Sequence, residues 1–145
     1  MFLIRIMKKP RFSLYQRIVL NNIPYRDDYN VNERIQWFAC SLGLFGIRDR
    51  DKSCFRVFVE LIKAANQDEM RTSDQLSEEL VLSRSTVIHH LNKLMDLGLV
   101  KNRRSKYGIN ANSLQGLVER IRGDSKAILD KLEKVAKKLD EEIKY

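Results

Sequence analysis

The chain has 145 residues, of which 43% are hydrophobic, and its formal net charge is +8. This length is typical of one domain with room for helical appendages, and six Gly and two Pro favour helices over a loop-rich fold. The basic balance fits a polyanionic partner. An enzyme is disfavoured because there is no Gly-rich phosphate loop and no nucleophile placed beside either of the two His. The longest apolar stretch, residues 35–47, is too short to span a bilayer, so no membrane partner is expected.

The cysteine and histidine pattern predicts neither a metal nor a cofactor. Cys40 and Cys54 lie in separate apolar segments, which indicates a reducing compartment, and we expect the cytoplasm. No C-x-C or C-x-x-C occurs. His89 and His90 are adjacent, and side chains of neighbouring residues on a helix diverge by about 100°, so they cannot chelate one ion together.

The first thirty residues are strongly basic, with six basic residues and no acid in residues 1–26. Phe2–Met7 and Ser13–Leu20 could pair as strands across KKPR, or the segment could be a basic arm that reaches into a minor groove. Both interpretations stay open. Two helices are predicted next. The first covers 32–45, capped by Asn32, and the second covers 51–65 and forms the core scaffold.

A helix-turn-helix follows. Thr72 and Gln75 have the spacing of a capping box, and the short helix after them turns Leu76 and Leu80 inward. After a turn, Ser83 caps a second helix over residues 83–97, and Gly98 ends it. Two helices joined by a turn of about three to four residues define this motif.

The second helix has one apolar face and one polar face. Val87, Leu91 and Leu94 recur at helical spacing and point inward. The other face offers short donors and acceptors that suit base edges in a major groove, with Ser85 and His89 as the preferred base contacts and Arg84 on a phosphate. The proposed DNA contacts of the motif are Thr72, Arg84, Ser85, Thr86, His89, Asn92 and Lys93.

A short basic hairpin is predicted after Gly98. The segment LVKNRRSKYGI reads as two strands around a polar tip, with a wing at residues 101–107. Residues 83–107 hold six basic residues and one acid. The cations expected on phosphates are Arg103, Arg104 and Lys106.

The C-terminal third carries a heptad seam whose apolar positions alternate in steps of four and three. Residues 113–145 hold eight basic and seven acidic residues, which suits a partner helix better than a nucleic-acid tail. We expect this helix to pair with its own copy, and packing on its own domain is the alternative. The dimerisation residues are Leu114, Val118, Ile121, Ile128, Leu132, Val135 and Leu139.

The segment from Ser83 to Val100, S-x-x-T-V-x-H-H-L-x-x-L-x-x-x-G-L-V, resembles the ArsR class of winged-helix transcriptional regulators. The resemblance covers about residues 51–110. It implies a dimeric, cytoplasmic, prokaryotic repressor, for which we expect an archaeal source. The cysteine pair of the metal-sensing branch is missing, and so is the usual wing glycine.

The sequence therefore predicts a mainly α protein. It has a winged helix-turn-helix domain with a short two-stranded wing and a long C-terminal coiled-coil helix. The predicted parts are a basic arm or strand pair at 1–31, the winged domain with a preceding helix at 32–110, and a dimerisation helix at 111–145. The predicted function is sequence-specific binding of double-stranded DNA as a homodimeric transcription regulator. A winged-helix module that binds protein or RNA is the alternative.

Overall fold

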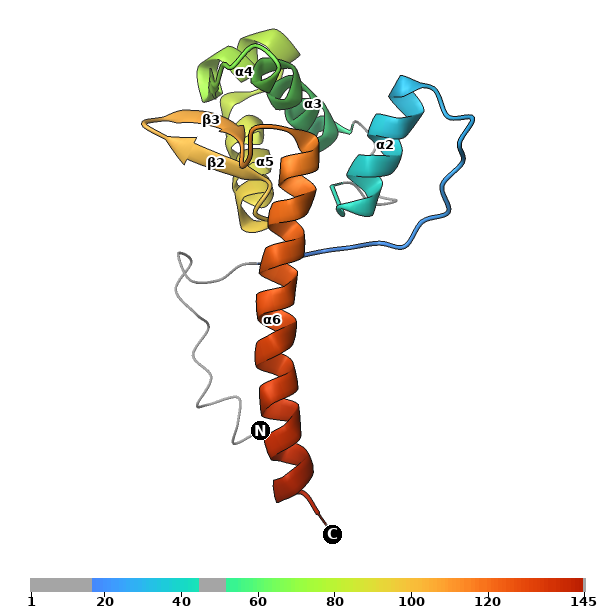
Figure 1. Ribbon diagram of the computed structural model, residues 1–145. Coiled ribbons are helices and arrows are strands. Elements are labelled where there is room, and N and C mark those ends of the chain that lie inside the picture. Colours follow the sequence, from blue (N-terminus) through green and yellow to red (C-terminus); the bar gives the residue numbers. More distant parts are fainter. Residues whose placement is uncertain (1–16, 45–51, 145) are drawn as a thin grey trace.

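The computed structural model describes residues 17–44 and 52–144. A helical head carries a small sheet at one edge, and one long helix extends from it like a stem (Figure 1). The elements in chain order are α2 (Val31–Ser41), α3 (Ser53–Ala65), β1 (Arg71–Thr72), α4 (Ser73–Leu80), α5 (Arg84–Asp96), β2 (Val100–Arg103), β3 (Lys106–Ile109) and α6 (Leu114–Glu142). The mainly helical winged helix-turn-helix fold is thus confirmed.

The N-cap of α2 lies two residues before the predicted one. Asn30, not Asn32, is the N-cap, and its Oδ1 accepts a 2.9 Å hydrogen bond from the backbone N–H of Glu33. The helix ends at Ser41 rather than near Phe45, because Gly43, at φ +73°, turns the chain into the left-handed region. Phe38, Ala39 and Leu42 pack against the core.

Helix α3 supplies the centre of the core. Cys54, Val57, Phe58 and Leu61 are essentially inaccessible to solvent, and Ala64 continues the same face. Phe55 and Ile62 are only partly buried and pack against this core from its edge. The helix contacts α4, α5 and β3, which makes α3 the scaffold on which the helix-turn-helix rests.

The wing is a three-stranded antiparallel sheet in the order β1-β3-β2, rather than the predicted pair of strands. β2 and β3 form the predicted hairpin, and the two-residue β1 adds to β3 through Arg71 opposite Tyr107 and Thr72 opposite Lys106. This third strand ties the start of α4 to the wing, so the motif and the wing form one rigid unit.

Helix α6 begins on the domain and leaves it. Its first three turns bury Leu117 and Ile121 in the core, whereas beyond Ser125 every side chain up to Lys144 is exposed. Among the residues that the structure describes, no helix is both long and apolar enough to cross a membrane.

Residues 17–30 form neither a helix nor a strand. The expected strand pairing therefore does not include residues 17–20, while Phe2–Met7 and residues 13–16 lie outside the described ranges. The segment passes beside the stem and then folds back to α2 (Figure 1). Backbone hydrogen bonds from Arg17 to Asp96 (3.1 Å) and from Asn21 to Ser41 (2.8 Å) hold it to the domain.

Candidate nucleic-acid interface

The start of α5 is organised by three hydroxyl side chains. Ser83 is the predicted N-cap, and its Oγ accepts from the backbone N–H of Thr86 at 3.2 Å. The Ser83 hydroxyl also lies 2.7 Å from Oγ1 of Thr86 and 3.2 Å from Oγ of Ser85. These hydroxyls lie at the N-terminus of α5, and a helix N-terminus is a favourable place for a phosphate.

One face of α5 is free of the core and polar. Arg84, Ser85, His89 and Asn92 are exposed, whereas Val87, Leu91 and Leu94 on the opposite face are fully buried. The apolar face and the polar face that the sequence predicted for this helix are therefore both present. Side chains of these types can hydrogen-bond base edges in a major groove.

Two of the predicted DNA-contact residues are less exposed than the others and already contact other parts of the protein. Thr86 is half-buried and engaged with Ser83. Lys93 is also half-buried, and its Nζ donates to the carbonyl oxygen of Leu44 at 3.3 Å. The sequence carries no signal for this contact, because the two residues lie far apart along the chain. Lys93 thus fastens α5 to the end of the α2 segment.

The adjacent histidines differ in environment. His89 is exposed and His90 is half-buried, with ring centroids 5.5 Å apart and ring planes 58° apart. His89 therefore faces outward with the other polar residues of α5. His90 lies at the flank of the helix, between the polar and the apolar face.

Thr72 stands where α4, β1 and the wing meet. Its Oγ1 accepts from the backbone N–H of Gln75 at 3.1 Å, and Oε1 of Gln75 accepts from the backbone N–H of Thr72 at 2.8 Å. The predicted capping box is thus present. Next to it, Arg71 contacts Glu69 at 2.7 Å and Glu79 at 3.4 Å, and its hydrogen bond with Glu69 raises the pKa of its guanidinium.

The wing tip holds its cations in solvent. Arg103 pairs with Lys106 across the hairpin, which leaves Arg104 and Ser105 as a two-residue loop with φ of 51° and 64°. Positive φ at both loop residues is what a tight type I′ hairpin requires, and glycine normally eases it. The wing forms without that glycine, and Arg103, Arg104 and Lys106 are all exposed.

The turn between α4 and α5 is held from both sides. The guanidinium of Arg56 on α3 donates to the carbonyl oxygen of Leu80 at 2.5 Å. The hydroxyl of Ser77 donates to the carbonyl oxygen of Leu82 at 2.5 Å. These carbonyls at a helix end would otherwise lack partners. The contacts fix the angle at which α5 leaves α4, and hence where its polar face points.

Within residues 17–44 and 52–144, no group of three or more His, Cys, Asp or Glu side chains is arranged to hold a metal ion. Among the described residues, Cys40 on α2 and Cys54 on α3 form no disulfide. Burial raises the pKa of the Cys40 thiol, against a smaller opposing effect of Lys52. A neutral thiol is a poor metal ligand.

Fold and site together define a class. A capped helix-turn-helix, a polar exposed face on its second helix and a basic hairpin beside it are the parts of a winged-helix DNA-binding domain.

Comparison with known protein families finds a match over part of the chain. Residues 59–102 match the model of the arsR family of bacterial regulatory proteins. The match spans α4 and α5 with most of α3 and β2, and it confirms the ArsR resemblance over that segment. The chain therefore carries the helix-turn-helix of a DNA-binding transcription regulator. An archaeal source has no support in this match.

Among solved structures, the chain is similar to a point mutant of ZitR from Lactococcus lactis at 19% identity. The TM-score is 0.36, with 97% of this chain and 82% of that chain covered. No curated protein sequence matches the chain.

Proposed function

We propose that the chain is a homodimeric, cytoplasmic regulator that reads double-stranded DNA with α5 in the major groove and the β2–β3 wing on the backbone. The observation that carries the proposal is the division of α5 into a fully buried apolar face and an exposed face of Arg84, Ser85, His89 and Asn92. Side chains of these types hydrogen-bond base edges and phosphates. No metal and no cofactor enter the proposal.

The wing extends this surface with positive charge. Arg103, Arg104 and Lys106 are exposed at a hairpin that pairs through β3 with β1, and β1 leads directly into α4. Charges so placed contact phosphates beside the groove, which adds affinity but little sequence preference. Thr72, at the same junction, contacts the phosphate backbone of the DNA next to the wing.

Dimerisation through α6 is supported by what the helix leaves uncovered. Ile128, Leu132, Val135 and Leu139 follow the heptad steps and are 38–60% exposed, and a row of apolar side chains on a lone helix favours association in water. The N-terminal seam residues Leu114, Val118 and Ile121 pack instead on their own domain or at its edge. Packing on its own domain therefore applies to the first turns of α6, and we propose pairing with a second copy for the exposed remainder.

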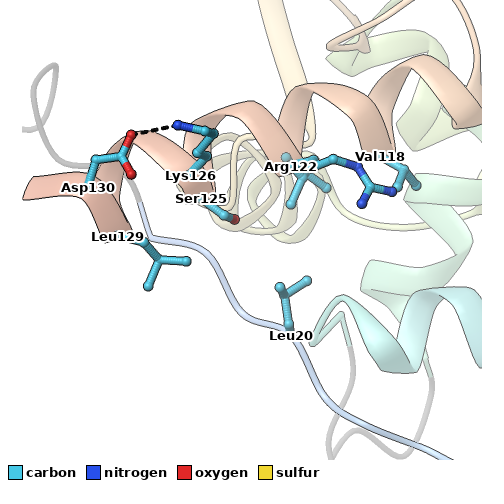
Figure 2. Close-up of a pocket in the computed structure, with 8 residues that line it drawn as sticks. Leu20, Val118, Arg122, Ser125, Lys126, Leu129 and Asp130 are labelled. Atoms are coloured by element: carbon cyan, nitrogen blue, oxygen red, sulfur yellow. Dashed lines mark hydrogen bonds and ion pairs between the residues drawn. The ribbon is translucent and has the colours of Figure 1, made fainter. Parts of the chain in front are cut away.

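A groove runs along α6 between the seam residues that pack on the domain and those that are exposed. A cavity of about 540 Å³ lies along α6, and Leu20 points across it toward the helix, opposite Ser125 and Leu129 (Figure 2). Val118 and Ile121 line its floor. A second α6 packed along the exposed seam would enter this groove and cover Leu20 and Leu129, which are more than half exposed.

The salt dependence of duplex binding tests the proposal. Each phosphate contact that a cation makes contributes about −0.9 to the slope of log K against log salt. Arg104→Ala should therefore weaken binding to every duplex alike and lower the slope by about 1. Arg120→Ala, which removes an exposed arginine from α6, is the matched control and should leave the slope unchanged.

Double-stranded RNA of the same length is the competing ligand in this assay. The proposal is contradicted if the two variants behave alike. It is also contradicted if the chain prefers the RNA duplex, an outcome that would favour the RNA-binding alternative.

A further inference from the structure

The outer face of α2 is covered by a strap formed by residues 21–30. Its first end is fixed at the C-terminus of the helix, where Asn21 donates from its backbone to Ser41 and from Nδ2 to the carbonyl oxygen of Cys40 at 2.9 Å. The middle is fixed by Trp37, whose Nε1 donates to the carbonyl oxygen of Ile23 at 3.1 Å. The last residue, Asn30, is the N-cap of the same helix.

The strap and the helix line an open pocket of about 240 Å³. Pockets for drug-sized ligands are about 300–1,000 Å³, so this cavity suits a smaller molecule. The described residues that line it are Ile23, Tyr29, Glu33, Gln36, Trp37 and Cys40. The core lies on the other side of α2, where Ala39 and Leu42 are buried, so the cavity is separate from the proposed DNA face.

Two of the lining residues, Trp37 and Tyr29, are aromatic, and the ring of Tyr25 packs against both. Tyr25 packs edge-on against Trp37, with centroids 4.9 Å apart and planes at 71°, and against Tyr29 at 5.6 Å and 84°. Because the indole N–H is bonded to Ile23, it is not available to a ligand. Trp37 and Tyr29 both line the pocket, and the face of an aromatic ring carries negative electrostatic potential.

Among the described residues that line the pocket, the charged side chain is an acid. Among the described lining residues Glu33 brings a carboxylate, and there is no Lys, Arg or His. The positive charge of Lys52, which does not line the pocket, lowers the pKa of the Cys40 thiol, but burial has the larger effect and raises it. Cys40 therefore adds no charge near neutral pH. An anion would find no partner here, whereas a cation would meet the ring faces and a carboxylate.

We propose that this strap pocket binds a small organic cation of the quaternary ammonium type, held by the faces of Trp37 and Tyr29 and by the carboxylate of Glu33. Aromatic side chains grouped with an acid are the established means of recognising such ligands, since the ammonium has no N–H to donate and is attracted to ring faces within about 6 Å. Cys40 and Ile23 supply the apolar base of the pocket.

Trp37 makes the test direct, because it is the single Trp of the chain. Full-length protein is titrated with choline chloride or tetramethylammonium chloride while its Trp fluorescence is recorded at constant ionic strength. Sodium chloride and the uncharged choline isostere 3,3-dimethylbutan-1-ol are the control ligands. We expect a saturable change with both ammonium ions and none with either control.

Two variants locate the response. Glu33→Gln keeps the size of the side chain and should raise the apparent Kd about tenfold, the effect of about 1.4 kcal/mol. Glu78→Gln, an exposed change on α4, is the matched control and should leave the Kd unchanged. Tyr29→Ala should abolish saturation, and its circular dichroism spectrum reports whether it folds.

The proposal is overturned if the uncharged isostere gives the same response as choline, or if Glu33→Gln binds as the wild-type chain does. None of these readouts requires DNA. Failure of the proposed DNA binding would therefore leave this result unaffected, and the reverse also holds.

Discussion

Arg84 and Asp74 form an ion pair between the first turns of α5 and α4, with Nε of Arg84 3.5 Å from Oδ1 of Asp74. Both side chains are about 70% exposed, so water screens the pair and its contribution to stability is small. The pair therefore places a carboxylate beside the cation that we propose for a phosphate. On DNA, Arg84 can exchange this carboxylate for a phosphate at little cost.

Asp74→Asn is expected to strengthen DNA binding. The change removes a negative charge next to the phosphate backbone and releases Arg84. An exposed pair of this kind is worth about 0.2–1 kcal/mol, which corresponds to about a one-and-a-half- to fivefold gain in affinity. The gain should be the same for every duplex and should shrink as salt is raised, as measured by fluorescence anisotropy.

Asp140→Asn on α6 removes an equal charge from an exposed position far along the stem and is the control. If Asp74→Asn binds no more tightly than Asp140→Asn, Arg84 does not contact a phosphate in the way proposed.

Lys93 and Lys106 should respond differently to the same substitution. Lys93→Met removes the ammonium that donates to Leu44, and we expect it to lower the free energy of unfolding by about 1 kcal/mol with the salt slope unchanged. Lys106→Met should leave stability within about 0.5 kcal/mol and lower the salt slope by about 1. Urea unfolding and anisotropy measure the two effects.

An equal loss of salt slope in both variants would show that Lys93 leaves Leu44 on DNA, in contradiction to the tethering role.

Local signals predicted the parts of the motif that depend on neighbouring residues. The capping box of Thr72 and Gln75 and the cap at Ser83 are confirmed because each cap is completed within three residues. The cap of α2 was wrongly placed at Asn32. Asn30 precedes Glu33 by the three residues that a capping contact needs, so the correct spacing was in the sequence.

Contacts between distant segments could not be predicted in this way. The bond from Lys93 to Leu44 depends on how α5 packs against the end of the α2 segment, and no periodicity reports it. The two-residue β1 is too short for a strand pattern to form. The strap over Trp37 has no regular element at all, so its only signal was a group of aromatic residues.

Val81 is a strained position in the turn between α4 and α5. It lies at φ +54° and is 87% exposed, so its branched side chain has a steric cost and gains almost no packing. Val81→Gly should raise stability by about 1 kcal/mol, and hence the Tm by about 2–4 °C, in a calorimetric scan.

Val81→Ala keeps a Cβ in the left-handed region and should gain clearly less. A Tm for Val81→Gly at or below that of the wild type would show that the turn relaxes in solution.

Leu132→Lys is expected to disrupt dimerisation without unfolding the domain. Leu132 is 60% exposed on α6, beyond the turns that pack on the core, so the single chain loses little when it is replaced. A charge at a seam position opposes helix pairing. Sedimentation should show the variant as a monomer at concentrations where the wild type is a dimer.

Ala127→Lys introduces the same side chain at an exposed position outside the seam and should remain dimeric. Wild-type protein that sediments as a monomer at every concentration would refute pairing through α6.

Selection of bound duplexes from a random pool tests the central claim most directly. If two copies read DNA through α5, the recovered sequences contain an inverted repeat whose half-sites lie about one helical turn, or a multiple of it, apart. Repeating the selection with Ser85→Ala and His89→Ala should relax base preference within each half-site and keep the spacing. Recovery of no enriched sequence at moderate salt, with binding governed by charge alone, would contradict a sequence-reading dimer.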